Sequence, residues 1–316
     1  MRLLCILLGF YGSLAAQSNQ RIKDLQVRVL STMLTDSAGI GEWGFAALIE
    51  ADGQRVLFDT GARPDTVWRN IQELKIDLST ITDVILSHNH GDHTGGLLML
   101  RRELSKSNPK ALSRAHAGKG IFLSRPGPNE AETNHVKTIR SQYEALGGSF
   151  TEYDGAKELF RGAWLTGPVK RVHPEKNWST RFPLVRLDGS RAEDNLPEDS
   201  SLVLDTEKGL VVIAGCGHAG IINTLEQARR EIRNAPIHAA IGGWHLFASS
   251  DEHLDWTSSK LKEFGIQNFL GAHCTGIEAV YRIRQGTGLS RRTCAVAAVG
   301  SGFTLKEGLQ TGAIAR

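Results

Sequence analysis

The sequence predicts an α/β sandwich in which two mixed sheets pack face to face and helices cover their outer faces. Strand-rich stretches are followed by helical patterns, and this order occurs in both halves of the chain. The 316 residues are 41% apolar and 22% charged, which is typical of a globular protein and excludes a disordered or collagen-like chain. The net charge is only +3 and no basic block stands out, so nucleic acid is not an expected partner.

The first 17 residues are predicted to be a signal peptide, and residues 18–316 a single domain. Arg2 precedes an uncharged apolar run from Leu3 to Ala16, which has small residues at its end and polar Gln17 after it. The run is too short to span a bilayer comfortably. We therefore expect a periplasmic or secreted protein with no stable membrane insertion after cleavage. An amino-terminal anchor or a buried strand is the alternative.

Ten apolar or β-branched runs are predicted strands. Two pairs of runs are separated by turn residues, at Ala51-Asp52-Gly53 and Glu207-Lys208-Gly209, and are predicted hairpins. The ten are Leu25–Leu30, Phe45–Glu50, Arg55–Asp59, Asp83–Ser87, Gly120–Ser124, Ser201–Asp205, Leu210–Ala214, Ile237–Ile241, Phe269–Gly271 and Ala295–Val299.

Five segments repeat apolar residues with the 3.6-residue period of a helix. Ser249 and Glu252 predict a capping box at the start of the fourth, and Gly286 predicts the end of the fifth. The less regular segment 101–195 is expected to supply loops over one edge of the sandwich. The predicted apolar faces are Val67, Ile71 and Leu74; Val136, Ile139, Tyr143 and Leu146; Ile221, Leu225, Ala228 and Ile232; Leu254, Leu261 and Phe264; and Ile277, Val280 and Tyr281.

The HNHGDH motif of residues 88–93, directly after a predicted strand, indicates a metal site. Three histidines and one carboxylate in six residues are costly in a core and unnecessary in a turn. In extended backbone His88 and His90 point to the same side and can bind one ion. The glycine lets the chain turn, so that Asp92 and His93 face a second ion. Imidazole nitrogen and carboxylate oxygen are ligands that suit zinc.

This motif resembles the HxHxDH signature of the metallo-β-lactamase superfamily, which the four residues meet in full. Asp59, in an Asp-Thr-Gly turn after a strand, is similar to the early aspartate of that family. The resemblance implies that Asp59 binds a ligand imidazole or backbone amides near the metal loop. The phrases CGHAG at 216–220, GGWHL at 242–246 and GAHCTG at 271–276 resemble one branch, related to dihydropterin–aminobenzene phosphate synthases.

The resemblance implies a dinuclear centre. Two zinc ions are expected, with iron and manganese left open as alternatives. The implied ligands are His88, His90 and His218 on one ion, and Asp92, His93 and His273 on the other.

Cys216 stands where most dinuclear members have a bridging aspartate. Its thiolate is a candidate metal or bridging ligand, and simple packing is the alternative. Glu198, before the second hairpin, is a weaker candidate. His245 is a candidate proton donor to the leaving group or to substrate, with a structural role as the alternative.

Removal of the signal peptide would leave Cys216, Cys274 and Cys294. In an oxidising compartment an odd number leaves at least one thiol unpaired, and the sequence does not predict a pairing. The remaining histidines are expected to be structural or at the surface; they are His116, His135, His173, His238 and His253.

The expected function is that of an exported zinc hydrolase, in which metal-bound hydroxide oriented by Asp92 attacks an ester, lactone or phosphoester of a small molecule. The resemblance leaves two other enzymes open: a dihydropterin–aminobenzene phosphate synthase-like enzyme and a β-lactamase. A metal or ligand sensor without turnover is the non-enzyme alternative, and the orienting aspartate argues against it. The sequence does not indicate an oligomeric state or a particular substrate.

Overall fold

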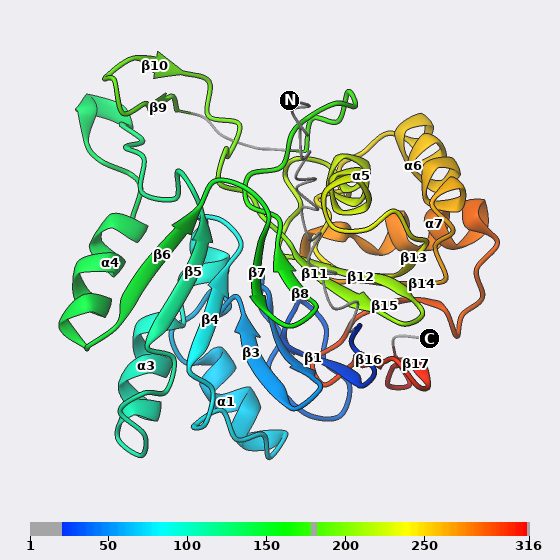
Figure 1. The fold of residues 1–316 in the computed structure, drawn as a ribbon, viewed down its shortest axis with the longest axis horizontal. Coiled ribbons are helices and arrows are strands. Elements are labelled where there is room, and N and C mark those ends of the chain that lie inside the picture. The colour runs from blue at the N-terminus through cyan, green and yellow to red at the C-terminus, as the bar shows by residue number, and fades with distance from the viewer. Residues whose placement is uncertain (1–20, 178–181, 315–316) are drawn as a thin grey trace, which may run out of the picture.

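The computed structural model describes residues 21–177 and 182–314, so the predicted signal peptide lies outside the described residues. Two large sheets face each other and helices cover their outer faces (Figure 1). This arrangement confirms the predicted α/β sandwich. In the described part of the chain no helix is long and apolar enough to cross a membrane.

The first sheet has eight strands in the order β17-β16-β1-β2-β3-β4-β5-β6. Strands β3 to β6 run parallel, and the remaining neighbours are antiparallel. The predicted hairpin turn joins β2 to β3, with Asp52 and Gly53 at φ values of 45° and 81°. The bounds are β1 (Leu25–Ser31), β2 (Ala46–Ala51), β3 (Gln54–Phe58), β4 (Asp83–Leu86), β5 (Arg114–Gly118), β6 (Ser149–Tyr153), β16 (Gly302–Thr304) and β17 (Gly308–Gln310).

The second sheet has seven strands in the order β15-β14-β13-β12-β11-β8-β7. Strands β12 to β15 run parallel, and the predicted second hairpin joins β11 to β12. A separate small hairpin pairs β9 (Leu184–Val185) with β10 (Arg191–Ala192). The sheet's strands are β7 (Lys157–Phe160), β8 (Ala163–Leu165), β11 (Leu202–Thr206), β12 (Gly209–Ala214), β13 (Ile237–Gly242), β14 (Asn268–Gly271) and β15 (Cys294–Val296).

The helices form the two outer layers. Apolar faces of α1 (Thr66–Glu73), α3 (Leu97–Ser105) and α4 (Val136–Ala145) pack on the first sheet. Those of α5 (Ile221–Glu231), α6 (Asp251–Glu263) and α7 (Ile277–Thr287) pack on the second (Figure 1). Three short helical turns complete the set: α2 (Gly91–Thr94), η1 (Pro128–Glu130) and η2 (His273–Thr275).

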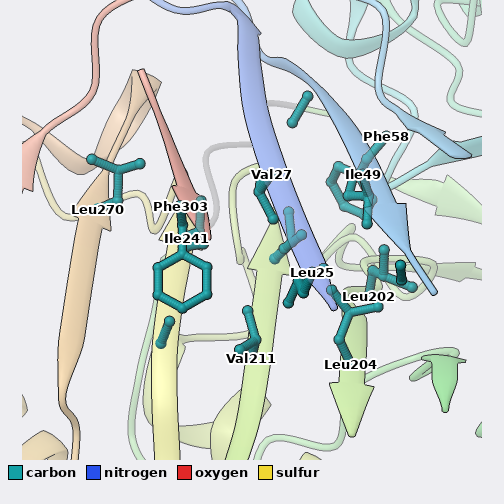
Figure 2. Packing of buried hydrophobic residues seen from close by; sticks show 14 of the residues in the cluster. Leu25, Val27, Ile49, Phe58, Leu202, Leu204, Val211, Ile241, Leu270 and Phe303 are labelled. Atoms are coloured by element: carbon teal, nitrogen blue, oxygen red, sulfur yellow. The ribbon is translucent and has the colours of Figure 1, made fainter. Parts of the chain in front are cut away.

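A dry apolar layer between the sheets holds the sandwich together. Side chains of the first sheet, such as Val27 and Ile49, face Leu204, Val211 and Ile241 of the second (Figure 2). All five are at most 1% exposed. Strands β12 and β13 are buried along their whole length because the other sheet covers one face and helices cover the other.

The prediction of a strand over Gly120–Ser124 is wrong. The parallel strand is β5, just before it, and the backbone turns at Gly120, where φ is 108°. Leu123 N–H donates to the Gly120 carbonyl, which closes this turn. Strand β5 has the sequence RAHAG, in which arginine and histidine interrupt the apolar pattern. Its His116 is satisfied by Asp83 of β4, so a polar side chain is tolerated there.

The segment 101–195 contains more regular structure than the expected loops over one edge. Besides α3, α4 and β5, this segment supplies β6, β7 and β8. Strands β6 and β7 lie at sheet edges and are largely exposed, so their sequences lack the apolar alternation of a half-buried strand. The three-residue strands β16 and β17 were not predicted either, because such short runs carry little pattern.

Three predicted element ends need correction. The cap of α6 is Ser250, whose Oγ accepts a hydrogen bond from the backbone N–H of His253, and not the Ser249 box. Helix α7 continues through Gly286, where a Cβ atom would lie 2.5 Å from that of Ser258 on α6, and ends before Gly288 at φ 78°. Glycine therefore allows close helix packing there. The last predicted strand spans residues 294–296 instead of 295–299.

The layer between the sheets should dominate stability. Leu204→Ala removes a fully buried side chain of this layer, and we expect it to lower the free energy of unfolding by about 2–5 kcal/mol. Leu187→Ala is the matched control, because Leu187 is 90% exposed and should change the value by less than about 0.5 kcal/mol. Urea denaturation followed by tryptophan fluorescence measures both. Equal effects of the two variants would contradict this account of the core.

Candidate metal centre

The candidate site lies at the carboxyl ends of parallel strands from both sheets. The HNHGDH motif follows β4, and the CGHAG phrase follows β12. The GGWHL and GAHCTG phrases follow β13 and β14, which are parallel neighbours of β12. Loops at this end of parallel strands are the usual location of ligand sites in α/β proteins. The two halves of the chain thus bring all four phrases to one place.

His88, His90 and His218 form the first group of imidazoles. Their ring centroids are 4.6, 4.8 and 5.0 Å apart. Nδ1 of His88 hydrogen-bonds Ser87 Oγ at 2.9 Å, and Nδ1 of His218 hydrogen-bonds the Asn177 carbonyl at 2.6 Å. The Nε2 atoms of His88 and His218 are buried and have no hydrogen-bond partner. With the proton held on Nδ1, each Nε2 presents a lone pair toward the group.

Asp92, His93 and His273 form the second group. Asp92 Oδ2 lies 3.2 Å from His273 Nε2 and 3.8 Å from His93 Nε2. The two imidazole centroids are 5.1 Å apart. The six residues assigned as ligands from the sequence thus lie in two neighbouring groups, and their assignment to metal ions stays a prediction.

Cys216 lies between the groups. Its sulfur belongs with His88 and His218 to one set of ligand atoms within 4.8 Å of one another, and with His93 and His273 to a second such set. The distance from Cys216 Sγ to His93 Nε2 is 3.1 Å. Burial, together with the neighbouring Cys274 sulfur, raises the pKa of the Cys216 thiol. A cation at this position would offset that effect, because metal ions deprotonate coordinating thiols.

The three cysteines of the described chain are all free thiols. Cys274 Sγ lies 3.2 Å from Cys216 Sγ and accepts a hydrogen bond from the backbone N–H of His245. Cys294 is separate, with its sulfur 3.5 Å from the Val280 carbonyl.

Asp59 forms hydrogen bonds to the loop after β4, which carries the HNHGDH motif. Its Oδ1 accepts from Ser87 N–H at 2.8 Å, and its Oδ2 accepts from Ser87 Oγ at 2.8 Å and from His93 Nδ1 at 2.7 Å. The loop after β12 fits against these groups only because residue 215 is glycine. A Cβ atom there would lie 2.1 Å from Ser87 Oγ and 2.5 Å from Asp59 Oδ2.

Three of the imidazoles are neutral, which is the state that binds a cation, whereas two carboxylates favour the protonated form of His93. Burial and the neighbouring imidazoles hold the pKa values of His88 and His218 well below the ordinary range, and burial lowers the pKa of His90 to about 4. These three side chains are therefore neutral at pH 7. Burial opposes protonation of His93 as well, but Asp59 and Asp92 raise its pKa to about 9. Neutral buried imidazoles with unpartnered nitrogens, one carboxylate and one thiol fit a divalent metal.

The remaining candidates differ in their surroundings. The ring of half-buried His245 lies 4.5 Å from that of His218, and its Nδ1 has no partner, so it joins the site. Both carboxylate oxygens of Glu198 accept from Arg125, at 3.0 and 2.8 Å, so its prediction as a weaker metal ligand is wrong. The adjacent Asp199 accepts from Ala219 N–H and thereby fixes the loop that carries His218.

The other histidines have partners outside the cluster. His116 bonds Asp83, His173 pairs with Glu226, and His238 bonds Gln267. The ring of His253 packs on Trp256. His135 bonds Thr94 Oγ1 at 2.9 Å, so it lies next to α2, the short helix that begins within the HNHGDH motif.

Sequence reasoning missed several residues of the site. In the sequence Cys274 is one of three thiols without a predicted pairing, and its contact with Cys216 joins positions 58 residues apart. Trp43, whose ring centroid is 4.9 Å from that of His273, had no signal at all, since it lies in an irregular segment between β1 and β2.

Two facing sheets with a histidine-rich cluster at the strand ends define an α/β sandwich with a candidate metal centre. The model of the metallo-β-lactamase superfamily matches residues 44–229 of this sequence. The chain therefore belongs to the metallo-β-lactamase superfamily.

Two relatives from Methanocaldococcus jannaschii cover most of the chain. One is a 7,8-dihydropterin-6-methyl-4-(β-D-ribofuranosyl)-aminobenzene-5'-phosphate synthase, 31% identical over 261 residues, or 78% of this chain and 87% of the relative. The other, an uncharacterised protein, is 28% identical over 250 residues, covering 77% of this chain and 87% of its own. The match to the synthase agrees with the branch that the later phrases resemble.

Solved structures show the same fold. Tm1679, described as a metal-dependent hydrolase of the β-lactamase superfamily, superposes with a TM-score of 0.69 and 28% identity, covering 88% of this chain and 98% of that one. YhfI from Bacillus subtilis, a metallo-β-lactamase fold protein, gives a TM-score of 0.55 at 12% identity over 89% of this chain and 100% of its own. The YhfI match shows the fold alone.

Asp59 should control metal affinity without being a ligand. We expect Asp59→Asn to weaken zinc binding by about 10- to 100-fold, because an amide nitrogen would face one of the donors that the carboxylate now accepts from. Competition with a fluorescent chelator measures this affinity. Asp83→Asn is the matched control, since that carboxylate bonds Arg114 and His116 at the start of β4. Unchanged affinity in Asp59→Asn would contradict the assigned role.

Proposed function

We propose that this protein is an exported zinc-dependent hydrolase that cleaves an ester, lactone or phosphoester bond of a small molecule. The observation that carries the proposal is the pair of ligand groups sharing Cys216, with buried and unpartnered imidazole nitrogens in each. Export is supported by the apolar run from Leu3 to Ala16, which precedes the polar Gln17.

In this proposal His88, His90 and His218 hold one divalent cation, and Asp92, His93 and His273 hold the other. Such a pair supplies a hydroxide nucleophile at neutral pH and polarises the bond under attack.

Asp92 is suited to orient the attacking group. It is the one carboxylate among the assigned ligands, and its side chain is 21% exposed, so one edge faces the open side of the site. Burial opposes its ionisation, but His93 and His273 keep its pKa below the ordinary range, so it remains an acceptor. His245, beside His218 and half-buried, is proposed to donate a proton to the leaving group.

Cys216 is proposed as the ligand shared by the two cations. In most dinuclear members of the superfamily an aspartate bridges at this point, and the thiol here is the group common to both ligand sets. A thiolate in the bridge donates more strongly than a carboxylate and favours softer cations. This chemistry supports zinc over manganese, while iron stays open.

The 31% identity to the dihydropterin–aminobenzene phosphate synthase supports a second candidate function. In that case the cations would supply Lewis acidity while the amine of an aminobenzene unit displaces a leaving group from the methyl carbon of a dihydropterin, and the amine proton passes to solvent. The 28% identity to Tm1679, described as a hydrolase, over 88% of this chain supports the first candidate. The ligand residues do not separate the two, because both reactions need an electrophile polarised at the same cations.

The number of metal ions bound per chain tests whether the two groups of side chains are metal ligands. Purified protein should hold two zinc ions per chain, and His218→Ala and His273→Ala should each lose about one, because each removes one ligand of one group. Elemental analysis by mass spectrometry provides the count. His116→Ala is the control, since its ring bonds Asp83 and Tyr153 away from the cluster. Full retention of both ions by both site variants would refute the assignment.

Substitution of Asp92 tests the catalytic role proposed for its carboxylate. We expect Asp92→Ala to lower kcat/KM by about 10²- to 10⁴-fold on any ester, lactone or phosphodiester that the wild type cleaves, because the attacking group loses its acceptor. A chromogenic panel of these substrates, run beside a synthase assay with a dihydropterin and a phosphoribosyl aminobenzene, separates the two candidate functions. Full activity in the variant contradicts the mechanism, and a wild type that binds metal without any turnover favours the sensor.

A further inference from the structure

We propose that Trp43 and Phe247 form an aromatic subsite at the mouth of the metal centre, which binds an aromatic ring of the substrate next to the bond that is cleaved. This inference rests on the proposed function and adds the substrate class to it.

The two rings are unusual among the large apolar side chains of the described chain because both are exposed. Trp43 is 49% and Phe247 is 52% exposed. Their centroids are 5.6 Å apart and their planes are nearly perpendicular, at 86°. They therefore form a corner that presents two ring surfaces to solvent.

This corner is continuous with the metal centre. Trp43 lies against the His273 ring at 4.9 Å, and Phe247 lies against the His245 ring at 5.2 Å. One wall thus touches an assigned metal ligand, and the other touches the proposed proton donor. A group seated in the corner lies beside the reacting bond.

Both walls are held rigidly by the loops of the site. Glu42, directly before Trp43, is buried and accepts from Ser31 Oγ at 2.7 Å and from the backbone N–H groups of Ala62 and Arg63. Phe45 N–H donates to the Asp92 carbonyl, which ties the same segment to the metal loop.

The second wall is fixed in the same way. Phe247 N–H donates to the Cys274 carbonyl at 3.2 Å. Gly276 approaches so closely that a Cβ atom on it would lie 2.8 Å from the Phe247 Cα. A corner that is already ordered loses little conformational entropy when it binds a ligand.

The chemistry of the corner selects an aromatic group. Aromatic rings prefer offset-stacked or edge-to-face neighbours, and two perpendicular rings offer both contacts to one planar ligand. A linear alkyl group of similar size would bury apolar area but would gain neither contact. The subsite should therefore discriminate benzyl from butyl compounds that have the same reactive bond.

The test uses zinc-loaded protein and two esters, benzyl acetate and butyl acetate, whose alkoxide leaving groups are similar. The ratio of their kcat/KM values should fall about three- to tenfold in Trp43→Ala and in Phe247→Ala. Trp43→Phe should keep most of the preference. Tyr281→Ala is the matched control, because Tyr281 is an exposed aromatic residue whose ring packs with Arg284 on α7.

A binding measurement separates this inference from the proposed function. Calorimetric titration of the zinc-loaded protein with 2-naphthol should give a Kd that is about three- to tenfold weaker in Trp43→Ala than in wild type and Tyr281→Ala. If neither the two acetates nor any ester, lactone or phosphodiester of the chromogenic panel is hydrolysed but this difference is found, the hydrolase proposal fails and the subsite stands. If the wild type does not bind 2-naphthol, or if all variants keep the wild-type Kd and substrate ratio, the subsite is refuted.

Discussion

The carboxylate of Asp59 is the contact on which the geometry of the metal centre depends. It is fully buried and receives three hydrogen bonds, two from Ser87 and one from His93. Through Ser87 Oγ it also sets the proton on His88 Nδ1. One side chain at the end of β3 thus fixes the tautomer of a ligand in each group. Burying a carboxylate costs free energy unless its oxygen atoms accept hydrogen bonds. Here Ser87 and His93, two residues of the site, supply the donors.

The fold class and the first metal motif could be predicted from the sequence, because both depend on local patterns. His88, His90, Asp92 and His93 lie within six consecutive residues. The buried strands are recognisable in the sequence as apolar runs. What could not be predicted is proximity across long separations or structure with a weak local pattern. The apolar pattern of strand β5 is interrupted by polar residues, whose side chains hydrogen-bond to neighbouring strands. The contacts of Trp43 and Cys274 arise only after the two sheets meet.

The same centre occurs on a superfamily fold that carries more than one reaction, as the synthase and hydrolase relatives of this chain illustrate. Because one fold carries different reactions, the side chains around the candidate centre must decide the substrate. In this chain the walls combine the neutral imidazoles of the first group with the two exposed rings of Trp43 and Phe247. Such surroundings favour a substrate whose recognised part is apolar.

The ligand groups also join the two halves of the molecule. His93 comes from the first sheet and Cys216 from the second, 123 residues later, and their side chains meet at 3.1 Å. A cation held by both binds only when the two sheets are docked, so its binding free energy adds directly to their association. Bound metal would then link the two sheets of the sandwich. Its loss would leave the apolar layer to hold the sheets together, so the cations would serve the architecture as well as the chemistry.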